Sequence, residues 1–286
     1  MKPKDLTDKN LKKILDDDEW TKCSERKEKM KNIGKIIWVI ALIAIIVLIG
    51  VVGFGYYKKS TFKAENPIVT MEVENFGTIK MELYPDQAPE TVSNFIALAN
   101  RGFYDGTKFH RIVKDFMVQA GSKDGDGTTG AKISDLKDDG SNEEYTIKGE
   151  FLANGVKNTI KFEEGILAMA RADYTQYSSG LADESYNSGS SQFFIMTKEN
   201  TNLNGYYTAF GKVIEGLDVV HKIEDVEVTV AEGQEETEGA EVSTPVNPPK
   251  VTSIRVETYG IDYGLPKTLE PFDYMTWLYK QYGINQ

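Results

Sequence analysis

The sequence is poor in the residues on which several common kinds of chemistry depend. Cys23 is the only cysteine among 286 residues, so no intrachain disulfide can form. The two histidines, His110 and His221, belong to no His/Cys group with metal-site spacing. No Ser or Cys lies in the local sequence of an activated nucleophile. These absences predict a protein that uses no metal or other cofactor and forms no covalent intermediate.

Positive charge is also scarce. The chain has 33 Lys and Arg against 44 Asp and Glu, a formal net charge of −11. The first 35 residues have a small basic excess, so the remainder is more acidic still. Affinity for nucleic acid comes mainly from Lys and Arg on phosphates, so this balance predicts that nucleic acid is not a partner. An acidic surface suits a domain that stays soluble beside a membrane.

One long stretch lacks charge altogether. Residues 36–57 are a run of 22 uncharged, mostly apolar residues. As a helix they would span about 33 Å, enough to cross a hydrocarbon core of roughly 30 Å. Trp38 at one end and Tyr56 and Tyr57 at the other suit the two interfaces. A cleaved signal peptide is the alternative, but the long leading segment and the lack of a small-x-small cleavage site favour an uncleaved anchor.

More basic residues precede this run than follow it closely. In membrane proteins the cytoplasmic flank of a span carries the excess of Lys and Arg. The sequence therefore predicts a single-pass protein of the cell membrane, with its N-terminus in the cytoplasm and its large domain on the outer side. The basic residues concerned are Lys22, Arg26, Lys27, Lys29, Lys31 and Lys35 before the run, and Lys58, Lys59 and Lys63 after it. The predicted parts are a cytoplasmic segment (1–35), a membrane anchor (36–57), a linker (58–65), a globular domain (66–260) and an aromatic tail (261–286).

The domain has the pattern of a mainly β fold. Alternating apolar residues in 68–74 and 79–83 flank Asn75-Phe76-Gly77, which is typical of a hairpin. Pro89 and Gly102 bracket apolar residues at helical spacing, which predicts one helix, and a second is expected near 217–223. Many short strands with few helices favour a closed antiparallel barrel.

Several polar segments interrupt this pattern. Residues 122–146 and 173–188 read as surface loops, with a role in access or partner choice as the alternative. Glycines 125, 127 and 130 have the spacing of a dinucleotide fingerprint, but no apolar helix follows them, so no such site is predicted. Residues 226–249 read as an acidic loop. The aromatic tail is expected to pack onto the domain or onto a partner, and the sequence leaves this open.

Residues 109–121 place a charge in an unusual setting. Arg111 lies close to aromatic, aliphatic and thioether side chains. If residues 115–119 are extended, Asp115, Met117 and Gln119 share one face and Phe116 and Val118 the other. One interpretation is a polar anchor in an apolar groove. The other is an edge strand whose arginine covers its neighbours with its methylene stem.

Three further motifs follow this one in order. They are GILAMARA at 165–172, GSSQFFIM at 189–196 and LNGYYTAFGKV at 203–213. The ordered series resembles the cyclophilin family of peptidyl-prolyl cis/trans isomerases, over about residues 66–260. The resemblance implies a closed eight-stranded antiparallel barrel capped by two helices. It implies rotation of X-Pro bonds in polypeptide substrates, which outside a membrane would assist the folding of translocated or surface proteins.

The resemblance also assigns roles to individual residues. Arg111 matches the family's catalytic arginine, and Gln119 matches the glutamine that helps bind the substrate backbone and orient that arginine. The positions that match the proline pocket and the surrounding substrate groove are Phe116, Met117, Ala170, Arg171, Ala172, Gln192, Phe194, Leu203 and Tyr207.

Two positions depart from the pattern of many relatives. Asn202 replaces a tryptophan, which removes an indole donor and predicts weak cyclosporin binding. Tyr207 replaces a histidine but keeps a ring and a hydroxyl, so activity is expected to survive. Two other functions stay open: a module that docks proline-containing segments without turnover, and an assembly factor whose tail or cytoplasmic segment carries specificity. Retention of Arg111 favours the enzyme, because a docking groove has less need of a charged donor.

Overall fold

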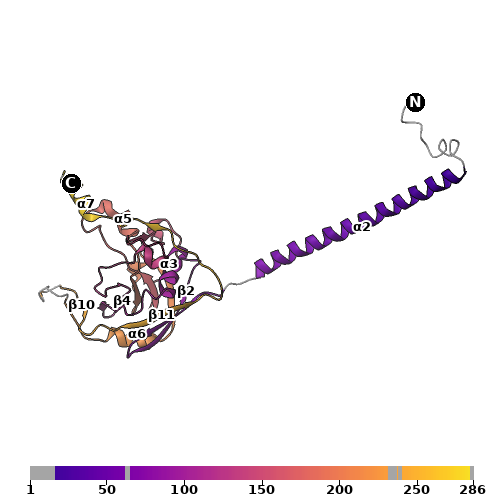
Figure 1. The fold of residues 1–286 in the computed structure, drawn as a ribbon. Helices are drawn as coiled ribbons and strands as arrows, with labels where there is room; N and C mark the ends of the chain where they lie inside the picture. Colours follow the sequence, from indigo (N-terminus) through magenta and orange to yellow (C-terminus); the bar gives the residue numbers. More distant parts are fainter. Residues whose placement is uncertain (1–16, 62–64, 231–236, 238–239, 284–286) are drawn as a thin grey trace. The chain divides into compact units, whose positions relative to one another are not determined.

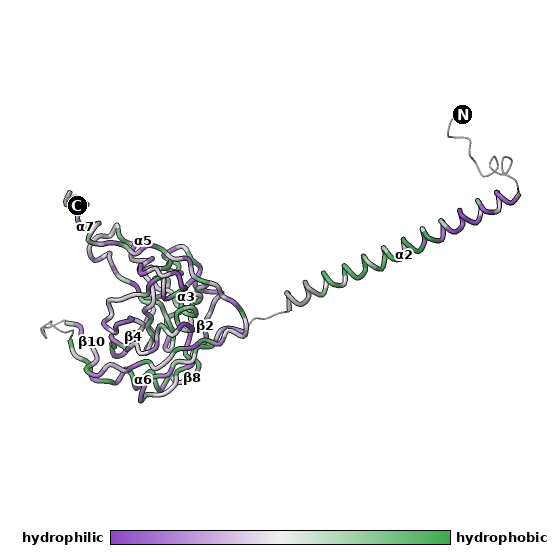
Figure 2. The backbone as a smooth tube through the Cα atoms, viewed as in Figure 1, coloured by the Kyte–Doolittle hydropathy of each residue, from purple (hydrophilic) through white to green (hydrophobic). Residues whose placement is uncertain are grey.

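The computed structural model describes residues 17–61, 65–230, 237 and 240–283. The chain divides into two compact units, Met1–Ala64 and Glu65–Gln286 (Figure 1). The first unit contains helix α2 (Asp17–Thr61), whose apolar part is flanked on its N-terminal side by a hydrophilic part (Figure 2). The helix is longer than the predicted anchor, because residues 17–35 are rich in Lys and Glu, which favour helix. By length and composition α2 qualifies as a membrane span, and a signal sequence would meet the same criteria.

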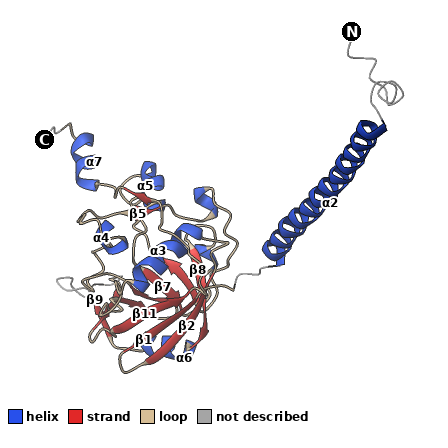
Figure 3. Ribbon diagram, turned by 45° about the vertical axis from the view of Figure 1, so that its right-hand side comes forward, coloured by secondary structure: helices blue, strands red, loops and turns tan. Residues whose placement is uncertain are grey.

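The second unit is built on one antiparallel sheet of eight strands that curls strongly (Figure 3). Its order is β11-β1-β2-β8-β6-β7-β4-β3. The strands are β1 (Ile68–Val73), β2 (Gly77–Leu83), β3 (Arg111–Val113), β4 (Met117–Ala120), β6 (Ile166–Met169), β7 (Phe193–Met196), β8 (Ala209–Glu215) and β11 (Val251–Glu257). The mainly β class, the strand number and the antiparallel pairing are therefore as predicted.

The prediction of a closed barrel is wrong, because the two edge strands, β3 and β11, do not pair with each other. The segments that precede them meet in one isolated bridge, Lys108 with Lys250, and in a hydrogen bond from Phe109 N to Pro249 O at 2.9 Å. Pro248 and Pro249 have no N–H to donate, so the chain before β11 cannot extend this contact into a ladder. The barrel is therefore open along this edge.

Two helices pack against the sheet at the predicted places. Helix α3 (Pro89–Asn100) begins at Pro89, and buried Glu150 accepts hydrogen bonds from the backbone N–H groups of Glu90 and Thr91 at its first turn. Its Phe95 ring lies 5.2–5.5 Å from the rings of Tyr104, Phe193 and Phe210 in the core. Helix α6 (Leu217–Glu224) buries Val219, Val220 and Ile223. The alternating residues of β1 and β2 complete the core.

The domain also has short elements that the sequence did not predict. Three additional helices lie in the polar insertion segments and the tail, where the periodic pattern is too short to detect. These elements are α4 (Ile133–Leu136), β5 (Thr146–Ile147), η1 (Leu152–Asn154), η2 (Ser179–Leu181), α5 (Ala182–Tyr186), η3 (Thr201–Leu203), β9 (Val228–Val230), β10 (Val242–Pro245), β12 (Thr268–Leu269) and α7 (Tyr274–Gln281). Residues 226–249, predicted as a loop, thus contain the paired strands β9 and β10.

The tail packs onto its own domain. Strand β12 pairs with β5, at the end of the first polar insertion. The Phe272 ring lies 5.0 Å from that of Tyr174, and the Tyr274 ring lies 4.5 Å from that of Tyr177. These contacts tie the tail to the second polar insertion, residues 173–188, as the first of the two alternatives predicts.

Candidate active site

Arg111 is the first residue of β3 and lies opposite Gln119 of β4. Its Nη1 lies 3.4 Å from Oε1 of Gln119 and 3.9 Å from Sδ of Met117. The guanidinium is therefore held over the side chains of the neighbouring strand. The hairpin register explains this arrangement, because directly opposed residues of an antiparallel pair project from the same face.

The turn that joins β3 to β4 differs from the predicted extended conformation. Asp115 has φ 56°, which is a left-handed conformation, and β4 begins only at Met117. The chain therefore reverses before Met117, and Phe116 and Met117 contribute to the same pocket instead of facing opposite ways. The two residues were predicted together as site residues only through the family resemblance.

An apolar pocket opens beside Arg111, with a volume of about 160 Å³. Behind it lies a small hydrophobic cluster that is separate from the main core and includes Met117, Phe162 and Phe194. The ring of Phe194 lies 6.3 Å from that of Phe162 and meets that of Tyr207 edge-on at 5.9 Å. The lining is formed by Arg111, Phe116, Met117, Gln119, Ala170, Arg171, Phe194, Leu203 and Tyr207. These are nine of the eleven predicted site residues.

A chain of amides leads from Arg111 to a second pocket. Gln119 Nε2 donates to Gln192 Oε1 at 2.9 Å, and Gln192 Nε2 donates to the Gly127 carbonyl at 2.9 Å. Each amide thus fixes the orientation of the next, and Gln119 is left with its oxygen toward Arg111. Gln192 is a predicted site residue that lines the second pocket and not the first.

The second pocket is polar and larger, with a volume of about 310 Å³. It is lined by residues from both polar insertions and from the tail, three segments for which no firm role was predicted. They are Gly127, Thr128, Gly130, Glu144, Tyr145 and Thr146 of the first segment and its edge, Tyr174 and Ser188 of the second, and Pro271 of the tail. Ala172 also lines this pocket. Its backbone N–H donates to Ser188 Oγ at 2.8 Å.

Arg171 separates the two pockets and lines both. Its guanidinium carbon lies 4.3 Å from the ring centroid of Tyr207, a cation–π contact. Nε and Nη1 donate to the carbonyls of Tyr206 and Ala172, both at 3.2 Å. The side chain is therefore a fixed wall between the pockets, and not a free surface arginine.

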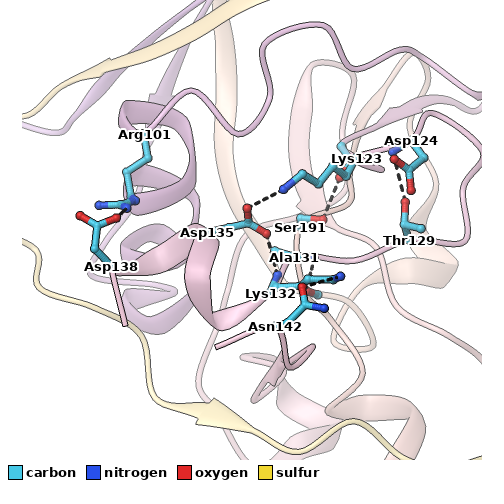
Figure 4. Close-up of polar contacts among 12 residues, drawn as sticks. Arg101, Lys123, Asp124, Thr129, Ala131, Lys132, Asp135, Asp138, Asn142 and Ser191 are labelled. Atoms are coloured by element: carbon cyan, nitrogen blue, oxygen red, sulfur yellow. Dashed lines mark hydrogen bonds and ion pairs between the residues drawn. The ribbon is translucent and has the colours of Figure 1, made fainter. Parts of the chain in front are cut away.

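The first polar insertion is ordered by its own polar contacts (Figure 4). Lys123 Nζ lies 2.6 Å from Asp135, whose other oxygen accepts from the Lys132 backbone N–H at 2.8 Å. Asp138 pairs with Arg101 of the main domain. These contacts hold the loop beside the polar pocket. Within the described parts of the chain, no three His, Cys, Asp or Glu side chains are close enough to hold a metal ion.

Glu241 is a residue in contact with Arg111 that sequence reasoning missed. Its two carboxylate oxygens accept from Nε and Nη2 of Arg111 at 2.6 and 2.8 Å. The bond to Arg111 is the largest cause of a lowered Glu241 pKa, about 2. Only its place in an acidic segment marked it, and nothing in the sequence pairs residues 130 positions apart.

His110, next to Arg111, has a lowered pKa because of burial, so the neutral imidazole is favoured. A neutral ring adds no positive charge beside Arg111. The ring packs close to Gly127, where a Cβ atom would lie 2.8 Å from His110 Cδ2. Gly127 also has φ +80°, so the position favours glycine on two grounds.

Comparisons with known proteins identify the family of the chain. Residues 68–256 match the family model described as cyclophilin type peptidyl-prolyl cis-trans isomerase/CLD. Peptidyl-prolyl cis-trans isomerase B of Bacillus subtilis is 38% identical over 156 residues, 54% of this chain and 90% of that protein. The isomerase of Acinetobacter baylyi is 33% identical over 198 residues, 68% of this chain and 87% of that protein. Peptidyl-prolyl cis-trans isomerase-like 2 of Rhizopus delemar is 34% identical, but this chain spans only 27% of its length.

A solved structure gives the same result for the fold. A Cryptosporidium parvum cyclophilin, crystallised in the presence of the dipeptide Ala-Pro, aligns with a TM-score of 0.50 and 27% identity, covering 66% of this chain and 98% of that one. The predicted function, peptidyl-prolyl cis/trans isomerisation, is confirmed through these named relatives. The chain belongs to the cyclophilin-type peptidyl-prolyl cis-trans isomerase family.

Proposed function

We propose that this protein isomerises X-Pro bonds of polypeptides with the proline ring in the apolar pocket and Arg111 as the key donor. The observation that carries the proposal is the guanidinium at the mouth of a pocket lined by Phe116, Met117, Phe194 and Leu203. A proline ring is small, apolar and rigid, and the pocket offers apolar walls with a charged donor on one side. The solved relative crystallised with Ala-Pro supports this class of substrate.

Isomerisation of an X-Pro bond requires little more than an apolar pocket and a fixed hydrogen-bond donor. The peptide bond rotates over a barrier of about 18–20 kcal/mol, and X-Pro bonds take tens to hundreds of seconds unaided. Rotation breaks the amide resonance, so a lone pair localises on the proline nitrogen. A fixed N–H donor that meets this lone pair, or a neighbouring carbonyl as it swings, stabilises the twisted state more than the planar one. Lowering the barrier by about 7 kcal/mol accelerates rotation about 10⁵-fold.

The amides and the wall residue have supporting roles. Gln119 keeps Arg111 over the pocket and offers its amide to the substrate backbone. Gln192, Ala170, Arg171 and Ala172 bind the residues that flank the proline, and Tyr207 closes the rim. Asn202 is the exposed middle residue of η3 and brings no ring to the pocket, so we expect weak cyclosporin binding. Tight inhibition at low nanomolar cyclosporin would contradict this part of the proposal.

The test of the proposal is isomerisation of an X-Pro peptide by the full-length chain in mild detergent, followed by NMR exchange. We expect acceleration by the wild-type chain and a loss of about 10²–10³-fold for Arg111→Ala, which removes the main donor. Equal acceleration by both proteins would support the isomerase activity but contradict the role of Arg111 as the key donor. Peptide binding without acceleration would favour a docking module, and loss of a membrane complex on deleting residues 265–286 would favour an assembly factor.

We also propose that α2 anchors the chain in the cell membrane, with residues 1–35 in the cytoplasm, residues 58–65 as a linker, and residues 66–260 and the tail outside. The length and apolar composition of α2 and the basic excess before residue 36 support this topology. The single cysteine offers a direct test. In intact cells an impermeant maleimide should leave Cys23 unlabelled, while Lys157→Cys, an exposed position of the domain, should react in a Cys23→Ser background. The reverse labelling would overturn the topology.

A further inference from the structure

The pairing of Arg111 with Glu241 is not explained by the isomerase chemistry. Arg111 already has partners on β4, in Gln119 and Met117. Glu241 comes from the segment just before β10, far along the sequence, and meets the guanidinium with both oxygens. A bidentate carboxylate–guanidinium pair is the strongest and most directional of these contacts.

The carboxylate holds one edge of the guanidinium, and a different nitrogen meets the pocket residues of β4. It takes one N–H from Nε and one from Nη2, whereas Nη1 points to Gln119 and Met117. Arg111 lines the pocket and Glu241 does not. A guanidinium has five N–H donors, so the pair occupies two of them and leaves three for Gln119, Met117 and a substrate. A proline peptide can therefore reach the pocket while the pair stays intact.

The position of Glu241 is itself fixed by the fold. Strand β10 pairs with β9 and lies against β3, the strand that begins at Arg111. The side chain of Ser243, a buried residue of β10, is a further cause of the lowered pKa of this carboxylate. With a pKa of about 2, Glu241 keeps its charge throughout the neutral range. The contact is therefore present under any condition in which the enzyme would work.

We infer that Glu241 is a positioning residue for Arg111: it clamps the outer edge of the guanidinium so that the Nη1 edge faces the substrate. A free arginine side chain has several rotatable bonds, and fixing it before the reaction removes an ordering cost from the transition state. The inference rests on the role proposed for Arg111. It assigns a function to the acidic segment, which otherwise reads as a surface loop.

The test compares Glu241→Ala and Glu241→Gln with the wild-type chain, full length in mild detergent, in the X-Pro exchange assay. We expect kcat to fall about five- to tenfold for Glu241→Ala while KM stays within about twofold, because the pocket walls are untouched. Glu241→Gln keeps the size and one acceptor oxygen, so it should lie between the two. In an Arg111→Ala background, Glu241→Ala should have no further effect.

A second readout separates positioning from general stability. In the wild-type chain the Nε–H resonance of Arg111 should be protected from exchange with water, and Glu241→Ala should abolish that protection. Glu227→Ala is the matched control, since Glu227 is exposed just before β9 and carries the same charge. It should leave kcat, KM and the resonance unchanged.

Each other result has a definite meaning. A higher kcat in Glu241→Ala would overturn the inference and make Glu241 a competitor of the substrate. An unchanged kcat, with Arg111→Ala still impaired, would overturn the inference alone. A wild-type chain without isomerase activity would overturn the proposed function and this inference with it.

Discussion

The apolar pocket and the polar pocket adjoin, but they are built from different parts of the chain. The apolar pocket is lined by residues of β3, β4, β7 and their neighbours, backed by a buried hydrophobic cluster. The polar pocket is lined mainly by two polar insertions and the tail. Strands fix side chains through their register, whereas loops depend on their own polar contacts. The comparison teaches that strand register and a buried cluster hold the apolar pocket in place, whereas the polar pocket depends on the contacts of loops and the tail.

The largest expected difference between the two pockets comes from one substitution in the apolar pocket and one in the polar pocket. Phe194 is 5% exposed and packs between Phe162 and Tyr207. Phe194→Ala should lower the free energy of unfolding by about 3–5 kcal/mol and kcat/KM by at least about tenfold, because it leaves a cavity in the pocket proposed for the proline ring. Urea unfolding and the exchange assay measure the two effects.

Thr128→Ala is the matched change in the polar pocket. Thr128 is exposed, so its loss should alter the unfolding free energy by no more than about 0.5 kcal/mol and leave turnover of a short X-Pro peptide nearly unchanged. Equal losses of unfolding free energy and of turnover in the two variants would contradict this division between the apolar pocket and the polar pocket.

A smaller effect is expected where the two pockets meet. Arg171→Ala removes the wall between them and the contact of the guanidinium with the Tyr207 ring. A cation–π contact contributes about 0.5–2 kcal/mol, so KM should rise about two- to thirtyfold with kcat little changed. Initial rates over a series of peptide concentrations give both constants.

Arg171→Lys is the control for charge. It keeps the positive charge but loses the planar group that stacks on the ring and donates to two carbonyls, so it should resemble Arg171→Ala more than the wild type. Full rescue by lysine would show that charge alone, and not the wall, determines KM.

The smallest effect concerns the support of the β3–β4 turn. His221 contacts Glu224 and Glu164, both at 3.0 Å, and the hydrogen bond with Glu224 is the largest cause of its raised pKa. Glu224 also accepts the backbone N–H of Asp115 in the turn, at 2.8 Å. Because the folded pKa lies above the unfolded value of about 6.5, this stabilisation is complete below that pH. It is lost as the pH rises through the folded pKa.

Urea unfolding of wild type and His221→Gln, from about pH 5.5 to about pH 8.5, tests this pH dependence. The difference in unfolding free energy should shrink as the pH rises, and it should be modest because the His221 side chain is 40% exposed. A difference that is constant across this range would exclude a role for the charge of His221.

Much of the fold and of the apolar pocket was predictable from the sequence. Alternation in 68–74 and 79–83 indicated β1 and β2, and Pro89 with the helical spacing after it indicated α3. Nine of the eleven predicted site residues line the apolar pocket, and Gln192 and Ala172 line the polar one beside it. These features are local or follow from ordered motifs, so the chain order alone carries them.

The errors have physical reasons. The barrel is open because two prolines cannot continue the pairing before β11, a detail that a strand count does not reveal. The turn at Asp115 places Phe116 and Met117 in one pocket, although simple alternation separates them. The short helices of the polar segments are stabilised by contacts with the domain, and not by a periodic apolar pattern.

The sequence by itself determined the class of the fold, the apolar helix, the family and the residues around Arg111, because each depends on short-range pattern or on motifs in a fixed order. Tertiary structure alone decided which distant segments meet at the site. It brought Glu241 to Arg111, Pro271 to the polar pocket and the tail aromatics to Tyr174 and Tyr177. Such contacts arise from the packing of segments far apart in the chain, and no periodicity or spacing in the sequence encodes them.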